Sequence, residues 1–91
     1  MGKILNKVDR AIVTTRLGRV RQGNLGDCDK IKDGCGLYEL RIHHGPGFRI
    51  YFGIVENRII LLVCGGTKRT QVKDIKKAKT YWQDYLKSLE V

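Results

Sequence analysis

Two segments of the chain, one near each end, repeat apolar residues at the three- and four-residue spacing of an α-helix. The first runs from Ile4 to Val20 and carries basic residues between its apolar positions. The second runs from Val72 to Leu89, and Thr70 precedes it in the place of an N-cap residue. The spacing predicts an amphipathic helix over residues 4–21 and a second one that begins after Thr70. Four residues favour the end of the first helix: Gly23, Asn24, Gly26 and Asp27.

Between these segments the chain shows the two-residue alternation of β-strands, from Leu37 to Cys64. The Gly45-Pro46-Gly47 segment and the Glu56-Asn57 pair interrupt it and indicate turns. A two-residue turn at Glu56-Asn57 sets three cross-strand pairs: Ile54 with Ile59, Phe52 with Leu61, and Ile50 with Val63. With a short extended piece at 28–31, the pattern predicts an α+β fold, an N-terminal helix packed on a small antiparallel meander of three to four strands, with a C-terminal helix.

The alternation divides the side chains of the meander between two faces. One face is almost wholly apolar and forms the expected core: Tyr38, Leu40, Ile42, Phe48, Ile50, Phe52 and Ile54. The other face receives a mixed set: Glu39, Arg41, His43, Arg49, Tyr51, Arg58, Ile60, Leu62 and Cys64. On this second face Ile60 and Leu62 need a cover, either the terminal helix or another chain.

Charge narrows the classes of partner. The chain has 91 residues, which predicts one domain over 1–91, and its formal net charge is +9. This excess of positive charge favours nucleic acid, an anionic membrane surface or an acidic protein as the binding partner.

The longest apolar run, Ile59 to Val63, is too short to span a bilayer, and no signal-peptide pattern is present, so we expect a cytoplasmic protein without a membrane partner. Cys28, Cys35 and Cys64 form no C-x-x-C pair and match no metal-ligand spacing, so neither metal nor cofactor is expected.

The candidate chemistry lies in the segment "ELRIHHGPGFRIYF", residues 39–52. A near-symmetric hairpin places Arg41 opposite Arg49, a like-charge contact that a bound anion would relieve. The alternative is a salt bridge of these arginines with Glu39 or with a carboxylate of a partner. His43 or His44 is the candidate proton carrier for RNA cleavage, and a structural role in the turn is an equal alternative for His44.

Further cations follow the last strand. Lys68 and Arg69 emerge after Gly65-Gly66 and can turn toward the arginine face, where Gln71 and Lys73 would complete a rim. Guanidinium groups bind phosphate, and Tyr51 on the same face would take an unpaired base, with simple packing as the alternative. The set of candidate RNA-binding residues is therefore Lys68, Arg69, Gln71, Lys73 and Tyr51.

Four stretches together resemble a known family: "GNLGD", "YELRIHHGPGFRIYF", "IILLVCGGTKRTQVKDI" and "KKAKTYW". They are similar to the bacterial addiction-module killer proteins, a HigB-like branch of the RelE/ParE toxin superfamily, from roughly Leu5 to Tyr85. The resemblance implies a type II toxin that cleaves mRNA on the ribosome without a metal, and a cognate antitoxin, often a helix-turn-helix protein, that neutralises it. Arg49 matches the sheet arginine expected to hold the scissile phosphate, and Arg41 and Lys68 match further basic positions of the motif.

The sequence also departs from the family pattern. Members usually begin with a strand and a fuller first helix, whereas Met1 here falls inside that helix, which would leave a sheet edge open to a partner strand or to a second copy. Many members have an acidic residue where Thr67 stands. The tyrosine that some relatives use for catalysis near the chain end has no clear counterpart here, and the nearest candidates are Tyr81 and Tyr85. Two alternatives to an mRNA interferase therefore stay open: a ParE-like gyrase inhibitor and a nontoxic remnant that binds antitoxin.

Overall fold

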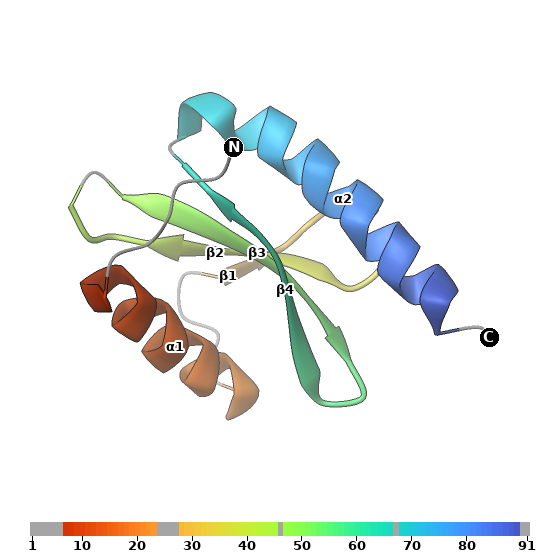
Figure 1. The fold of residues 1–91 in the computed structure, drawn as a ribbon, viewed down its shortest axis with the longest axis horizontal. Helices are drawn as coiled ribbons and strands as arrows, with labels where there is room; N and C mark the ends of the chain where they lie inside the picture. The colour runs from red at the N-terminus through yellow and green to blue at the C-terminus, as the bar shows by residue number, and fades with distance from the viewer. Residues whose placement is uncertain (1–6, 24–27, 46, 67, 90–91) are drawn as a thin grey trace.

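The protein is an α+β fold with one helix on each side of a four-stranded antiparallel sheet (Figure 1). The computed structural model describes residues 7–23, 28–45, 47–66 and 68–89. The elements in chain order are α1 (Lys7–Arg21), β1 (Cys28–Lys30), β2 (Leu37–Ile42), β3 (Phe48–Val55), β4 (Arg58–Gly65), the 3₁₀ turn η1 (Lys68–Thr70) and α2 (Gln71–Ser88). This layout confirms the predicted fold class. Some predicted features lie outside the described residues: the helix start at Ile4, the turn residues Asn24, Gly26, Asp27 and Pro46, and Thr67.

The sheet is a meander in the order β1-β2-β3-β4, and every neighbouring pair is antiparallel. Glu56 and Asn57 both have positive φ, 48° and 66°, which is the backbone of a tight two-residue hairpin turn between β3 and β4. This turn sets the predicted pairs Ile54 with Ile59 and Phe52 with Leu61. Both pairs are confirmed, because the turn fixes the register nearest to it.

A bulge changes the register farther along the β3–β4 ladder. Tyr51 pairs with Val63 and Ile50 with Cys64, so Leu62 is an extra residue on β4. The predicted pair of Ile50 with Val63 is therefore wrong. Because one extra residue moves every later side chain to the other face, Cys64 packs on the face of Ile50, not on the polar face as predicted.

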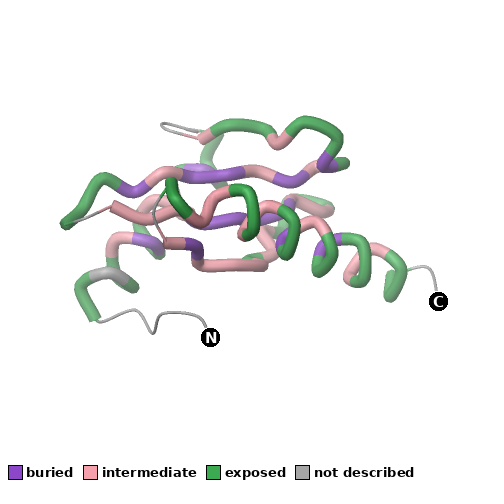
Figure 2. The backbone as a smooth tube through the Cα atoms, turned by 90° about the horizontal axis from the view of Figure 1, so that it is seen from above, coloured by how far each residue is buried: buried purple, intermediate pink, exposed green. Residues whose placement is uncertain are grey.

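Both faces of the sheet carry a core, whereas the sequence predicted one. On the first face α1 packs with Val13 and Val20 against a buried set from the strands: Leu40, Ile42, Ile50 and Phe52. On the second face α2 packs with Ala78 and Trp82 against Leu37 and Tyr51, and it covers Ile60 and Leu62. The terminal helix, not another chain, thus covers this apolar part. Figure 2 shows buried residues along the strands and exposed outer turns on both helices.

The inward stripe of α2 centres on Trp82, whose indole nitrogen donates a 2.9 Å hydrogen bond to the carbonyl of Cys35. Val72, predicted to belong to this stripe, is 83% exposed, and Leu89 is exposed as well. Thr70 precedes α2 as predicted, but its hydroxyl bonds the Asp74 carboxylate (2.7 Å) and makes no capping bond to the helix backbone. No helix within the described ranges is long and apolar enough to cross a membrane.

Candidate anion-binding site

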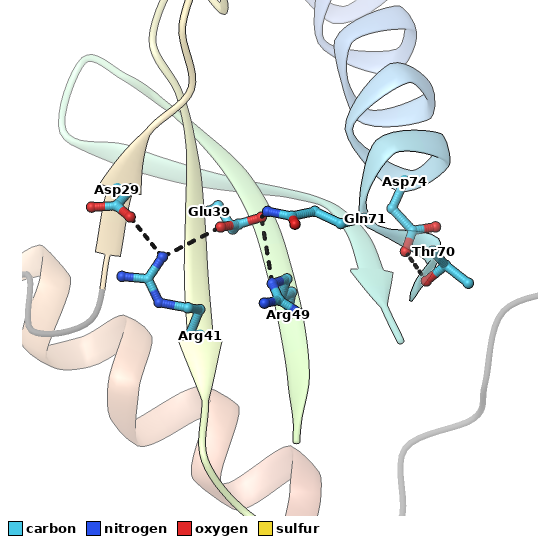
Figure 3. A network of polar contacts seen from close by, with 7 residues as sticks. All are labelled: Asp29, Glu39, Arg41, Arg49, Thr70, Gln71 and Asp74. Atoms are coloured by element: carbon cyan, nitrogen blue, oxygen red, sulfur yellow. Dashed lines mark hydrogen bonds and ion pairs between the residues drawn. The ribbon is translucent and has the colours of Figure 1, made fainter. Parts of the chain in front are cut away.

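Arg41 on β2 and Arg49 on β3 lie directly opposite each other in the β2–β3 ladder. Residues paired in this way point to the same face of the sheet, so the two guanidinium groups share the face that α2 covers in part (Figure 3). The predicted cross-strand pair of arginines is therefore confirmed. Its like charges need anionic neighbours or an anionic ligand.

Two carboxylates supply part of this compensation. Arg41 Nη1 lies 2.6 Å from Oδ2 of Asp29, on β1, and 3.5 Å from Oε1 of Glu39, on its own strand. Arg49 Nε lies 3.7 Å from Oε2 of Glu39. The salt-bridge alternative weighed from the sequence is thus present for both arginines. Glu39 is buried, with 4% of its side chain accessible, whereas 65% of the Asp29 side chain is accessible.

Glu39 also connects the arginine pair to α2. Gln71, the first residue of α2, donates a 2.8 Å hydrogen bond from its side-chain amide to Glu39 Oε2. The carboxylate therefore lies among groups from β2, β3 and α2, as Figure 3 shows. Gln71 was expected to bind RNA from a rim, and here its amide is directed inward to the carboxylate.

An open pocket of about 330 Å³ remains beside the arginines. It lies at the β2–β3 hairpin end of the sheet and is lined by Arg41, Ile42, His43, Gly47, Phe48, Arg49 and Lys68. Four predicted site residues thus meet around one opening: Arg41, His43, Arg49 and Lys68. The carboxylates do not close the arginines off from solvent, and the pocket offers cationic donors and one imidazole to an anionic ligand.

Tyr51 follows the packing alternative and not the base-stacking role. It is fully buried under α2, with 0% of its surface exposed, so it presents no ring face on which a base could stack. Its hydroxyl is buried without a hydrogen-bond partner of good geometry among the described residues, and the same is true of Arg49 Nε. Burial, and next the charge of Glu39, raises the pKa of Tyr51 well above its ordinary value, so this phenol stays protonated at neutral pH.

The other predicted site residues lie outside the pocket lining. His44 is exposed in the hairpin turn, where its carbonyl accepts a 3.0 Å hydrogen bond from the Gly47 amide, in line with the structural alternative. Arg69 and Lys73 are exposed near the start of α2, and Arg69 directly follows Lys68 in η1. Within the described part of the chain, no three His, Cys, Asp or Glu side chains gather as metal ligands would.

Sequence reasoning missed Asp29 as a member of the site. The alternation of side chains within β1 could have indicated it. Cys28 packs in the core between α1 and the sheet, so the next residue, Asp29, points to the opposite face. Asp29 pairs with Glu39 in the β1–β2 ladder, which brings its carboxylate within reach of Arg41. Because β1 is only three residues long, its register could not be assigned from the sequence.

The comparisons with known proteins give one informative relationship. No family model matches the chain, and no solved structure matches it. The chain is 39% identical over 84 residues to an uncharacterized protein of Haemophilus influenzae strain Rd, and this alignment covers 92% of the chain and 83% of the relative. The chain therefore belongs to the same family as this uncharacterized Haemophilus influenzae protein.

Proposed function

We propose that the protein is the toxin of a bacterial type II toxin–antitoxin module, an endonuclease that cleaves mRNA on the ribosome and is neutralised by a cognate antitoxin. One observation carries this proposal: Arg41, Arg49, His43 and Lys68, which come from three separate parts of the sequence, line a single open pocket. The net charge of +9 and the sequence resemblance to the killer proteins support the same function.

The proposed reaction is attack of a ribose 2′-hydroxyl on the adjacent phosphorus. The 2′ oxygen loses its proton and bonds to phosphorus, the bond from phosphorus to the 5′ oxygen breaks, and that oxygen takes up a proton, which leaves a 2′,3′-cyclic phosphate. Arg41 and Arg49 would stabilise the charge that grows on the non-bridging oxygens. The imidazole of His43 would take up and deliver the proton, and Lys68 would hold a neighbouring phosphate.

The carboxylates of the site are compatible with this role. The Asp29 side of the Asp29–Arg41 pair is solvent-accessible, and such an ion pair contributes only about 0–1 kcal/mol to the free energy of folding. A phosphate can therefore replace Asp29 as the partner of Arg41 at little cost. Glu39 is buried and lies within ion-pair distance of both arginines. A phosphate would therefore meet Arg41 and Arg49 from the pocket side.

The test is induced expression of the wild type and of Arg49→Ala in a bacterial host. Loss of one donor to the charged phosphate should lower the cleavage rate about 10²–10³-fold, which should abolish growth inhibition. Arg58→Ala is the matched control, because Arg58 is an exposed arginine at the start of β4, beside the β3–β4 turn and at the far end of the strand from the pocket. The control variant should stay toxic. Undiminished toxicity of Arg49→Ala would contradict the assignment.

Mapping of transcript ends after induction identifies the target. New cuts within translated reading frames support the mRNA endonuclease. DNA breaks with intact transcripts would instead indicate gyrase inhibition, and a wild type that does not slow growth would indicate a nontoxic remnant that binds antitoxin.

A further inference from the structure

We propose that Glu39 is a positioning residue of the phosphate site, an inference that rests on the proposed function. Its carboxylate holds Arg49 from the side away from the pocket and links this arginine, through Gln71, to the first turn of α2. No part of the sequence resemblance gives Glu39 a role. Three features support this role: the burial of Glu39, its contacts with Arg41, Arg49 and Gln71, and the accessible part of Arg49.

Burial is the first step. Among the residues that the structure describes, Glu39 is the charged side chain with almost no accessible surface. A buried carboxylate is tolerated when cations and hydrogen-bond donors compensate it. Here Arg41 and Gln71 donate hydrogen bonds to the carboxylate, Arg49 lies at ion-pair distance, and the phenol of Tyr51 lies near it as well. The position of each donor is therefore coupled to the position of this carboxylate.

Arg49 has a buried part and an accessible part. Its Nε atom is buried and faces Glu39, and it has no hydrogen-bond partner of good geometry among the described groups. The side chain is nevertheless 17% accessible, and it lines the pocket. The accessible surface of Arg49 belongs to atoms other than Nε, so Glu39 lies at the buried Nε while other atoms of the residue remain accessible. A guanidinium fixed in this way can bind phosphate without first losing rotamer freedom.

The charge of Glu39 and its positioning of Arg49 have opposite effects on RNA affinity. Glu39 is an anion close to an anion site, so its charge alone weakens phosphate binding. If it acted only through charge, Glu39→Gln should tighten RNA binding, by up to about fivefold for one ion-pair interaction. If it positions Arg49, the same variant should weaken binding about tenfold despite the more positive net charge, because the new amide lacks one of the two carboxylate acceptors.

The experiment measures the affinity of the purified full chain for a short fluorescein-labelled single-stranded RNA that carries 2′-O-methyl groups and so resists cleavage. We expect weaker binding by Glu39→Gln and no change in Glu56→Gln, which removes the same charge from an exposed turn. Equal or tighter binding by Glu39→Gln would overturn the proposal. If Glu39→Gln does not fold, Gln71→Ala takes its place: it removes one partner of Glu39 from the helix start and should weaken RNA binding in the same direction.

A double-mutant cycle separates positioning from a general effect on the fold. In an Arg49→Ala background, Glu39→Gln should cause no further loss of RNA affinity, because the residue through which it acts is absent. Additive losses would show that Glu39 supports the fold without positioning Arg49. Thermal unfolding of each variant shows whether the native state is retained.

A last readout does not depend on RNA. In nitrogen-labelled protein the Arg49 Nε–H signal should exchange slowly with water, and Glu39→Gln should speed this exchange at least severalfold. Unchanged exchange would overturn the positioning role even if the protein cleaves RNA. If the wild type neither binds RNA nor cuts transcripts while the exchange responds as expected, the proposed function fails and the contact between Glu39 and Arg49 stands.

Discussion

Tyr51 lies directly opposite Glu39 across β2 and β3, on the arginine face of the sheet, and it has no access to solvent. Its phenol hydroxyl is buried without a hydrogen-bond partner of good geometry among the described residues. An unsatisfied buried hydroxyl is unfavourable, and a negative carboxylate nearby makes ionisation of the phenol more so. Tyr51 therefore acts as a core residue whose phenol oxygen lies near the Glu39 carboxylate without forming a hydrogen bond of good geometry.

Tyr51→Phe should consequently be neutral or should stabilise the fold by up to about 1 kcal/mol at neutral pH. The pH dependence has a definite sign. Burial raises the folded-state pKa of Tyr51 above the ordinary 10.0, so its contribution to stability is fully present below pH 10 and is lost as the pH rises further. Above pH 10 the wild type should lose up to about 1.4 kcal/mol per pH unit more than the variant. Denaturant unfolding of both proteins between pH 8 and 11 measures this difference, and parallel curves would contradict it.

The same residue shows which part of the site the sequence could predict. Alternation places Tyr51 on the face of Arg41 and Arg49, and this placement is correct. Alternation does not say how far a helix extends over that face. Whether Tyr51 is available to a base depends on where α2 lies, and this is decided by the packing of Trp82 and Ala78 far along the chain.

At the scale of elements, α2 packs closely on the sheet where the Trp82 ring lies against Gly53 of β3. A Cβ atom built on Gly53 would overlap the Trp82 ring, so the absent side chain makes room for the indole. Gly53→Ala should force α2 away from the sheet and destabilise the fold by about 1–3 kcal/mol. Denaturant unfolding followed by fluorescence of Trp82, the single tryptophan, measures the loss.

Gly18→Ala is the matched control for that prediction. Gly18 lies within α1, and a Cβ atom there would have nothing within 4 Å. Because alanine favours the helix over glycine, this variant should stabilise the fold by roughly 0.5–1 kcal/mol. The same chemical change should thus have opposite signs at the two positions. A stable Gly53→Ala protein with unchanged fluorescence would show that Trp82 does not require the gap.

The limits of prediction at this scale have local causes. Register near the β3–β4 turn followed from Glu56-Asn57, because a two-residue turn allows one pairing of the adjacent strands. The bulge at Leu62 did not follow, because nothing in an uninterrupted apolar run marks where an extra residue is accommodated. The role of Gly53 did not follow from the sequence either, because its partner in space, Trp82, comes much later in the chain.

At the scale of the whole molecule, the positive charge is divided between two sides of the sheet. Arg19 and Arg21 are exposed in the last turn of α1, the helix that packs on the face opposite the arginine pair. Lys68 and Arg69 are exposed in η1, where β4 leads into α2, and Lys68 lines the pocket. If RNA binds at the pocket, these two groups of cations should differ in their effect although they contribute equally to the net charge.

The salt dependence of RNA binding tests this difference. For single strands, each phosphate that a cation neutralises adds about 0.7 to the slope of log affinity against log salt concentration. The double variant Lys68→Gln, Arg69→Gln should lower that slope by roughly 1.4 when each side chain contacts a phosphate, and it should weaken binding at every salt concentration. Arg19→Gln, Arg21→Gln removes the same charge from α1 and should leave the slope unchanged. Equal losses in the two double variants would mean that RNA follows the overall charge of the protein and not the pocket.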